Sequence, residues 1–335
     1  MKLQSSPINE TNALEWDNFL IEQQINNPFQ SAAFLLALRH NQFYQPFGKF
    51  FRNDQGKIVG GYVGINSHET RGIVSSLTTR TIINGGPVVL GNQPDCLNEI
   101  LADLAVCKDA NGIYMELWHD QESRSLNLVY QKNGFCYHPH LNYLIDLSVG
   151  KEELWQRIAK RKRRYIKGNF DSVEISPVKD LPQLHFCYDL FAQTYRRIHL
   201  PLLDFSVFKD IFKANLGIFL LAKKDGQPVA ARVALHFNFS LYDWFAGDNT
   251  DHRGLHANES LVWWLFEYGF INGYNVFNFG GAGKPGHPYG PREFKKDFGG
   301  NLVEYGRHRL ILSPLRYQIL DLGIKLRKWI ITQKR

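Results

Sequence analysis

The sequence has few cysteines, and their spacing excludes a cysteine-based scaffold. Its four cysteines lie far apart, and no Cys-x-x-Cys pair occurs. This spacing speaks against a zinc module and against a disulfide framework. We therefore expect most of the four to be buried thiols.

The sequence also lacks long apolar segments. No apolar run reaches the roughly 18 residues that a membrane-spanning helix needs. The N-terminal segment MKLQSSPINETNALEW lacks the apolar core of a signal peptide. A cytoplasmic, reducing compartment is the expectation that follows.

Apolar and basic residues, by contrast, are well represented. Hydrophobic residues make up 44% and aromatic residues 14% of the 335 residues, which is enough for two domains of ordinary size or one large one. The formal net charge is +7 and the sequence pI is about 9.1. Such a charge favours a polyanionic partner: nucleic acid, an anionic membrane surface or a phosphorylated substrate.

The most distinctive stretch is the glycine-rich segment 277–301, FNFGGAGKPGHPYGPREFKKDFGGN. It is not a P-loop, because no Gly-Lys-Ser/Thr closes the turn, and its glycines do not fit a dinucleotide fingerprint. The pattern predicts a short strand at Val276 to Phe279, a turn, and a helix from Pro291 to Phe298. Glycines of the turn, Gly281 and Gly283 among them, allow positive φ and a close approach to a ligand.

Charged side chains on this predicted helix favour an anionic ligand. Arg292, Lys295 and Lys296 would lie near a loop of exposed N–H groups, while Phe294 and Phe298, four residues apart, would anchor the helix to the core. The alternative is a flexible loop followed by an amphipathic helix with solvated lysines.

The order of predicted elements repeats in the two halves of the chain. Hairpin signals with turns at Gly56 and Gly226 occur early in each half. Helix-to-glycine junctions follow at Gly134 and Gly299, and the number of residues between them is nearly the same as that between the two hairpin turns. A duplicated α/β unit, with its boundary at residues 148–152, is the simplest explanation. Because hairpin strands come first and then alternate with helices, we expect mixed sheets with helices on both faces.

Further elements are predicted at the ends of the two units. Leu144 to Leu147 is expected to be the final strand of the first unit, and Arg307 to Leu312 the last strand of the second. Between the units, a helix from Glu152 to Lys167 carries five consecutive basic residues, 160–164. This face, Arg163 included, is expected to contact phosphates of RNA or of an anionic headgroup. A solvated basic face is the alternative.

The C-terminal segment, 315–335, mixes apolar residues with Arg and Lys. We expect a basic amphipathic helix that packs on the body of the protein. Docking to an anionic membrane is the alternative.

Several of these motifs together resemble one known family. Phe294-Lys295 is followed by Phe298-Gly299-Gly300, just after a predicted strand that ends in Gly280-Gly281. This arrangement resembles the end of the FemA/FemB/FemX (FemABX) family, whose members are aminoacyltransferases that use aminoacyl-tRNA to lengthen the peptide of cell-wall precursors. Residues 242–281 follow the order of elements in that family, and Arg163, Ile166 and Lys167 resemble its Arg-x-x-Ile-Arg/Lys signature. The resemblance covers residues 155–312 well and the first half by architecture alone.

The resemblance implies a fold class as well as an activity. The expected class is α/β (mixed α+β), with two tandem GNAT-like domains of the acyl-CoA N-acyltransferase fold. The first would span residues 1–149 and the second, which carries the FemABX motifs, residues 150–314. The helix of residues 315–335 would follow. The activity would be transfer of an amino acid to an amine of a peptidoglycan precursor, forming the cross-bridge.

The resemblance also implies site residues and partners. Lys295 would be the catalytic residue, because the lysine of the Phe-Lys motif lies at the reaction centre in the family. No metal and no bound cofactor are expected. Aminoacyl-tRNA would be the co-substrate, a nucleotide- or lipid-linked muropeptide the acceptor, and an anionic inner membrane face a peripheral partner. The residues expected to bind substrate are Arg39, Arg163, Arg292, Phe294, Gly281, Gly283 and Tyr242.

Two other classes of function stay open. One is an acyl-CoA N-acyltransferase acting on an amino sugar or exopolysaccharide precursor, in which a CoA thioester would be the donor. The loop 251–256 speaks against it: it begins with an acid and ends with a histidine, where pyrophosphate-binding loops read Gln/Arg-x-x-Gly-x-Gly/Ala. An acid there would repel a pyrophosphate. The other class is a non-catalytic RNA- or membrane-binding module that kept the fold. The donated amino acid and the oligomeric state are left open.

Overall fold

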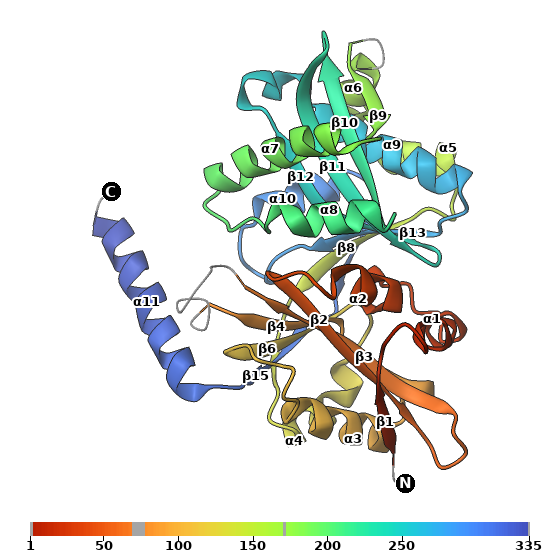
Figure 1. The fold of residues 1–335 in the computed structure, drawn as a ribbon. Coiled ribbons are helices and arrows are strands. Elements are labelled where there is room, and N and C mark those ends of the chain that lie inside the picture. The colour runs from red at the N-terminus through yellow and green to blue at the C-terminus, as the bar shows by residue number, and fades with distance from the viewer. Residues whose placement is uncertain (1–2, 69–77, 170–171, 334–335) are drawn as a thin grey trace.

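The computed structural model describes residues 3–68, 78–169 and 172–333, which form two β-sheets with helices packed on them. Figure 1 shows the sheet with the first strands of the chain in the lower half of the molecule and the second sheet in the upper half. We call the first sheet A and the second sheet B.

Sheet A has eight strands in the order β1-β2-β3-β4-β6-β15-β7, and β5 pairs with β3 off this path. The expected hairpin is present, since β2 and β3 pair antiparallel around the turn that contains Gly56. The strands are β1 (Gln4–Pro7), β2 (Tyr44–Arg52), β3 (Ile58–Ser67), β4 (Arg80–Gly85), β5 (Val88–Val89), β6 (Tyr114–His119), β7 (Cys136–His138) and β15 (Arg307–Ile311).

Sheet B has seven strands in the order β14-β8-β13-β12-β11-β10-β9. Its hairpin, β10 with β11, turns at Gly226 as the sequence predicts. The strands are β8 (Leu141–Asp146), β9 (Glu174–Pro177), β10 (Gly217–Lys224), β11 (Gln227–Phe237), β12 (Ser240–Asp248), β13 (Val276–Gly281) and β14 (Asn301–Glu304).

The two sheets repeat one pattern, which confirms the predicted mixed α/β fold built from two similar units. In each sheet an antiparallel hairpin is followed by a third antiparallel strand, a helix and a strand parallel to the third. In sheet A the parallel pair is β4 with β6, and in sheet B it is β12 with β13. The duplication is therefore visible in strand direction as well as in element order.

Each unit gives its last strand to the sheet of the other. Strand β8, from the first half of the chain, lies between β13 and β14 in sheet B. Strand β15, from the second half, lies between β6 and β7 in sheet A. The strand predicted at Leu144 to Leu147 is present as part of β8, but it pairs in sheet B. The sequence could not predict this pairing, because an apolar strand carries no local signal of which sheet it joins. The domain bounds 1–149 and 150–314 stay a prediction, and neither sheet is built from one of these segments alone.

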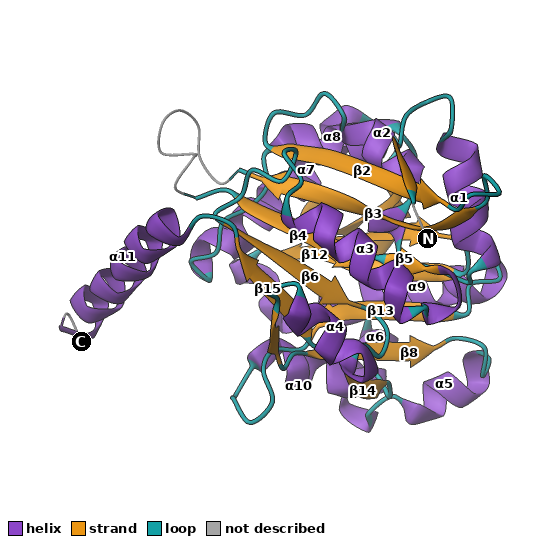
Figure 2. Ribbon diagram, turned by 90° about the horizontal axis from the view of Figure 1, so that it is seen from below, coloured by secondary structure: helices purple, strands orange, loops and turns teal. Residues whose placement is uncertain are grey.

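Helices cover both faces of each sheet (Figures 1 and 2). In β10, Phe219 and Leu221 pack towards α7 and α8, while Leu220 and Ala222 pack towards α9. This alternation follows from the two-residue period of a strand. The helices are α1 (Ala13–Glu22), α2 (Ala32–Leu38), α3 (Pro94–Ala105), α4 (Asn127–Lys132), α5 (Lys151–Arg157), α6 (Lys160–Gly168), α7 (Leu181–Arg197), α8 (Phe205–Lys213), α9 (Ala257–Ile271), α10 (Gly290–Lys296) and α11 (Pro314–Gln333).

The helix predicted from Glu152 to Lys167 is two helices, α5 and α6. Ile158 has an extended backbone (φ −66°, ψ 133°) and a buried side chain. The next N–H, of Ala159, donates to the carbonyl of Asp297 at 2.8 Å. The chain breaks here because burying Ile158 and bonding to the end of α10 replace one helical turn, a tertiary effect with no local sequence signal.

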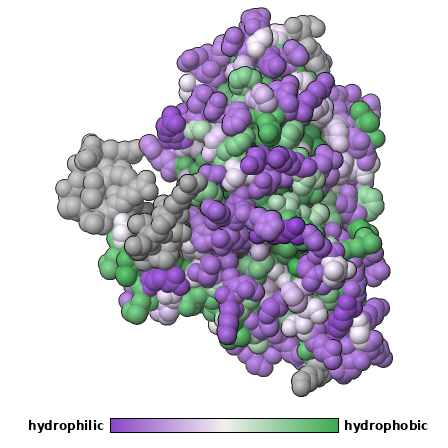
Figure 3. Space-filling model, viewed as in Figure 1, coloured by the Kyte–Doolittle hydropathy of each residue, from purple (hydrophilic) through white to green (hydrophobic). Residues whose placement is uncertain are grey.

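One hydrophobic cluster is shared by the two units. Phe34 and Tyr44 of the first unit pack with Phe191, Phe208 and Phe219 of the second. Aromatic side chains bury large apolar areas, so this cluster holds the two sheets in a fixed relation. The outer surface on the face shown in Figure 3 is mostly hydrophilic, with scattered apolar areas.

Helix α11 projects away from the rest of the molecule (Figures 1 and 2). Its start is fastened to sheet A, since Tyr317 packs edge-on against Tyr114 at 6.0 Å. Farther along, Ile319 and Leu322 are exposed. Over residues 314–323, whose side chains the structure describes, the expected packing on the body is therefore seen at Tyr317 but not at these two residues. Within the described part of the chain, no helix is both long and apolar enough to cross a membrane.

A buried pair of histidines joins the exchanged strand β15 to its neighbour β6. The Nε2 of His119 lies 2.8 Å from the Nδ1 of His308, and the Nε2 of His308 lies 3.0 Å from Oδ1 of Asn127. Because the amide oxygen accepts, His308 donates from Nε2 and accepts from His119. Burial and the neighbouring His308 lower the pKa of His119 to about 3. Burial lowers the pKa of His308 to about 4.

We expect the protein to lose stability as the pH falls from 7 to 5. Both folded-state pKa values lie below the ordinary value of about 6.5, so the unfolded chain binds more protons in this range. The stabilisation is complete above about pH 6.5 and is lost as the pH falls towards the folded-state values, by on the order of 2 kcal/mol per histidine at pH 5. Urea unfolding at each pH measures the loss. His308→Gln should show a shallower decrease, and an identical decrease would contradict the role given to the pair.

Candidate active site

A groove of about 570 Å³ lies between the two units and is lined by residues of both. Sheet A contributes Arg80, Trp118 and Arg307, and the second unit contributes Tyr242 and Lys295. Other lining side chains include Phe29, Tyr44, Asn84, His140, Tyr195, Asp243 and Tyr289. Because the exchanged strand β15 brings Arg307 to the groove, the exchange is part of how the groove is built.

Lys295 reaches the groove from helix α10, with its ammonium held by carbonyls at the end of strand β13. Its Nζ donates to the carbonyl oxygens of Phe279, at 2.5 Å, and Gly281, at 2.7 Å. The helix is anchored by the fully buried Phe298, whose ring lies 5.2 Å from that of Phe294. The predicted helix is therefore confirmed, although it ends at Lys296, two residues early.

The glycines of the turn are required by close packing. Gly280 has φ +67°, and a Cβ there would lie 2.9 Å from the hydroxyl of Tyr242. At Gly281 a Cβ would lie 2.9 Å from the ring of His140, and at Gly283, with φ +79°, it would lie 2.9 Å from the ring of Tyr289. These residues admit no side chain without a shift. They fix the two carbonyls that hold the lysine.

The electrostatic setting of Lys295 lowers its proton affinity. Burial lowers its pKa to about 8, with the carboxylate of Asp243 opposing the shift and Arg232 adding to it. The ammonium is thus charged at neutral pH but gives up its proton more readily than an exposed lysine. Two of its three N–H donors are used by the carbonyls of Phe279 and Gly281.

Helix α10 separates the groove from a second hollow of about 550 Å³. Lys295 lines the groove, whereas its neighbour Phe294 lines the second hollow. The buried ion pair of Arg232 and Asp243, with N–O distances of 2.6 and 2.7 Å, spans the same partition: Arg232 lines the hollow and Asp243 the groove. The two spaces therefore meet at one wall.

The ring of Phe294 lies between two cations. Lys162 has its Nζ 4.0 Å from the ring centroid, and the guanidinium of Arg232 lies 5.8 Å away. Lys162 also donates to Glu259 at 2.8 Å in an ion pair that is almost fully buried. These contacts hold Phe294 in place. Because Lys295 is the next residue on α10, they also fix the position of its backbone.

Two arginines give the groove its positive charge. Arg307 stacks over Trp118, 4.1 Å from the ring, and lies 3.8 Å from Glu116. Burial lowers its pKa, and Glu116 opposes that effect. Arg80, at the start of β4, lines the same groove. Neither residue was predicted from the sequence, because β4 was not predicted and neither arginine belongs to a local motif.

The groove continues into smaller polar cavities. A cavity of about 40 Å³ shares Tyr242, Gly281 and Arg307 with the groove. It adjoins one of about 240 Å³ through the shared residues Asn27 and Asp120. Asn27 donates to Asp120 at 2.7 Å, and burial raises the pKa of that carboxyl. The groove and the two cavities are thus neighbours that share polar lining residues.

The predicted site residues fall into three groups. Lys295, Tyr242 and Gly281 come together in the groove, and Phe294 lies just behind it. Gly283 packs against Tyr289 at the edge of the turn. Arg292 donates to the carbonyls of the glycine-rich turn at 2.7, 3.1 and 2.6 Å, so it fastens the turn.

Two predicted residues lie elsewhere. Arg39, at the end of α2, pairs with Glu10 and donates to His40 at 3.0 Å on the surface. It does not line the groove. Arg163 lies on the outward side of α6, in a separate basic hollow. Among the described residues, no group of three or more His, Cys, Asp and Glu side chains could hold a metal ion.

Comparisons with known proteins agree with this geometry. Residues 156–296 match the family model described as an acetyltransferase (GNAT) domain. No curated protein sequence matches the chain. A solved structure of FemX is similar over 94% of this chain and 99% of its own, with a TM-score of 0.72 and 14% identity.

Two further solved structures share the arrangement. A tandem GNAT protein from the clavulanic acid biosynthesis pathway covers 93% of this chain and 99% of its own, with a TM-score of 0.62 and 9% identity. L-PGS from Bacillus licheniformis covers 92% of this chain and 95% of its own, with a TM-score of 0.53 and 14% identity. At such identities the likeness shows the fold.

The fold and the matched domain together define an acyltransferase of the GNAT fold with two units in tandem. Within that class the arrangement of the units is similar to that of FemX, which confirms the predicted tandem GNAT-like fold.

The contribution of the buried Lys162–Glu259 ion pair to stability can be tested by removing one partner. Lys162→Met should lower the free energy of unfolding by about 3–5 kcal/mol, because it leaves Glu259 buried without its cation. Lys162→Met combined with Glu259→Gln should recover much of that loss. Lys160→Met, on the exposed side of the same helix, should change stability by less than about 0.5 kcal/mol. Urea unfolding measures all three, and equal effects of the two single variants would contradict the assignment.

Proposed function

We propose that this acyltransferase moves an amino acid from aminoacyl-tRNA to an amine of a cell-wall precursor peptide. The observation that carries the proposal is the ammonium of Lys295, held by two backbone carbonyls at the wall shared by the groove and the second hollow. Such a group stabilises negative charge that develops on oxygen while an ester is cleaved.

The proposed reaction needs no covalent enzyme intermediate. The neutral amine attacks the ester carbonyl carbon, a C–N bond forms, and the bond from that carbon to the ribose oxygen breaks. Lys295 gives a proton to the leaving oxygen, and the proton that the amine sheds restores the ammonium. A lysine whose pKa is lowered to about 8 is well matched to this exchange near neutral pH.

The groove is the proposed site of the acceptor. Arg80 and Arg307 would bind the phosphates of a nucleotide- or lipid-linked muropeptide, and the connected polar cavities would take the peptide. The second hollow, on the far side of Phe294, would hold the 3′ end of the donor. The aminoacyl ester itself would have to extend past α10 into the groove, because Lys295 lines the groove and the amine and the ester must meet beside it.

A CoA thioester is the alternative donor, and the matched acetyltransferase (GNAT) domain supports it. The loop beside the second hollow argues against it. The N–H groups of Asp251, His252 and His256 are bonded within the loop, to Asn249 and Arg253, so they do not point at a pyrophosphate. A shift of melting temperature by acetyl-CoA, and none by aminoacyl-tRNA, would favour the alternative.

The proposal keeps the predicted cytoplasmic location, with peripheral contact at the inner membrane face. Exposed apolar side chains on α11, such as Ile319 and Leu322, support that contact. A lipid-linked acceptor would make it useful. Binding of the full chain to anionic vesicles tests the membrane contact separately from transfer. Polar substitutions at Ile319 and Leu322 should abolish this binding.

Lys295→Ala should lower the rate of transfer on the order of 10²–10³-fold without unfolding the protein. The assay supplies tRNA charged with a mixture of labelled amino acids and a nucleotide-linked muropeptide, and follows the peptide product by mass spectrometry. The matched control is Lys296→Ala, which removes the exposed neighbouring lysine and should leave the rate unchanged. Undiminished transfer by the Lys295 variant would remove the lysine from the mechanism.

The pH dependence gives an independent test of the same residue. Because the ammonium is the active form and its pKa is about 8, kcat/KM calculated for the neutral form of the acceptor amine should be retained below pH 8 and should fall as the pH rises through 8. Lys295→Arg, which stays charged throughout, should be slower but should lack this limb. The same alkaline limb in the arginine variant would assign the titration to another group.

A further inference from the structure

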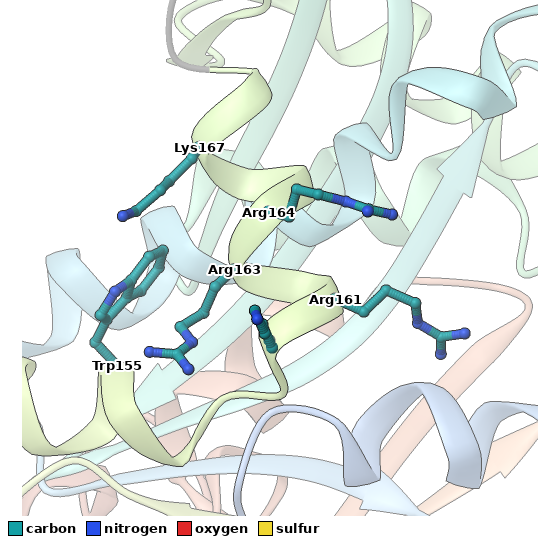
Figure 4. Close-up of a pocket in the computed structure, with 6 residues that line it drawn as sticks. Trp155, Arg161, Arg163, Arg164 and Lys167 are labelled. Carbon is teal, nitrogen blue, oxygen red and sulfur yellow. The ribbon is translucent and has the colours of Figure 1, made fainter.

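A hollow of about 670 Å³ lies on the outward side of α6, apart from the groove (Figure 4). One aromatic residue and five basic residues line it: Trp155, Lys160, Arg161, Arg163, Arg164 and Lys167. Trp155 comes from α5 and the basic residues from α6. The break between these helices turns the indole ring to the side of the basic helix.

The indole ring of Trp155 lies beside two cations. The ammonium of Lys167 is 5.9 Å from the ring centroid. Figure 4 shows the side chains of Lys167 and Arg163 on the same side of α6 as the ring, with Arg161 and Arg164 on the other side. Arg163 donates from Nη1 to Gln156 at 2.9 Å, whereas its Nε is buried without a partner.

The charge of the hollow is largely uncompensated among the described residues. Arg161 pairs with Asp297 at 2.8 Å, and no ion pair is found for the other basic residues that line the hollow. Cations arranged around an aromatic ring provide phosphate contacts and a stacking surface for a base together. That combination suits a single-stranded nucleic acid.

A lipid surface fits the hollow less well. Trp155 is packed edge-on against Trp263, with ring centroids 4.6 Å apart, and belongs to the margin of a hydrophobic core. A ring held in a concave hollow in this way cannot insert into a bilayer, whereas a flexible strand can enter and stack. The geometry therefore favours RNA over an anionic headgroup.

The opposite side of α6 faces the candidate active site. Lys162, one residue from Arg161 and Arg163, reaches inward to Phe294, which precedes Lys295 on α10. A strand bound on the outer side of α6 would thus lie one helix away from the wall at which acyl transfer is proposed.

We propose that this hollow binds the single-stranded 3′ segment of the donor RNA, with a base stacked on Trp155 and phosphates held by Arg163 and Lys167. The inference rests on the proposed function for the identity of the donor, but RNA binding itself can be measured without transfer.

The test is fluorescence anisotropy with a labelled RNA hairpin that carries a four-nucleotide single-stranded 3′ end. Trp155→Leu and the double variant Arg163→Gln/Lys167→Gln should each weaken binding about tenfold. The double variant should also reduce the slope of log Kd against log salt by about 1.4, or about 0.7 for each lost phosphate contact. The charge-matched control Lys57→Gln/Lys132→Gln, at exposed positions of the first unit, should bind as the wild type does. Circular dichroism confirms folding.

The outcomes separate this inference from the proposed function. If the wild type transfers amino acids from tRNA while the hollow variants bind RNA and use the donor with unchanged KM, the inference is overturned and the function stands. If the wild type shows no transfer but the variants lose RNA binding, the RNA site stands and the function fails. Loss of binding to phosphatidylglycerol vesicles, with RNA binding intact, would overturn the inference in favour of a lipid surface.

Discussion

The reciprocal exchange of β8 and β15 is the constraint on which the rest of the structure depends. Each sheet is completed by a strand from the other half of the chain, so backbone hydrogen bonds run between the halves on both sides. The shared aromatic cluster adds apolar contact at the same boundary. Separating the units would expose unpaired strand edges as well as this cluster. The space between them is therefore held in a fixed shape, and Arg307 is brought into it.

Lys295 shows how local and tertiary constraints combine at the site. A buried ammonium is unfavourable unless oxygen atoms surround it. The end of β13 supplies the carbonyls of Phe279 and Gly281, and a Cβ at Gly280 or Gly281 would lie too close to Tyr242 or His140. Arg292 fastens the glycine-rich turn, and the ring of Phe294, between Lys162 and Arg232, fixes the helix. In this glycine-rich motif Lys295 therefore faces the groove, and the glycines, Arg292 and Phe294 hold its side chain in place.

Much of this glycine-rich motif could be predicted from the sequence, because its signals are local. Hairpin turns, a proline near the start of α10 and a glycine after its end each specify backbone geometry within a few residues, as Gly299 does with φ +77°. The exchange of strands could not be predicted, since an alternating apolar strand reads the same in either sheet. Arg307 was missed for that reason, whereas Arg80 was missed because β4 was not predicted and the residue belongs to no local motif. The break at Ile158 was missed because burial against another element overrode a continuous helical pattern.

The most direct test of this site is the ionisation of Lys295 itself. Lysine labelled with ¹³C at Cε can be followed by NMR across pH, with the Lys295 signal identified by its absence in Lys295→Arg. A buried ammonium bound to two carbonyls should titrate with a midpoint near 8. A midpoint near the ordinary lysine value of about 10.4 would place the side chain in open solvent and would contradict the groove described above.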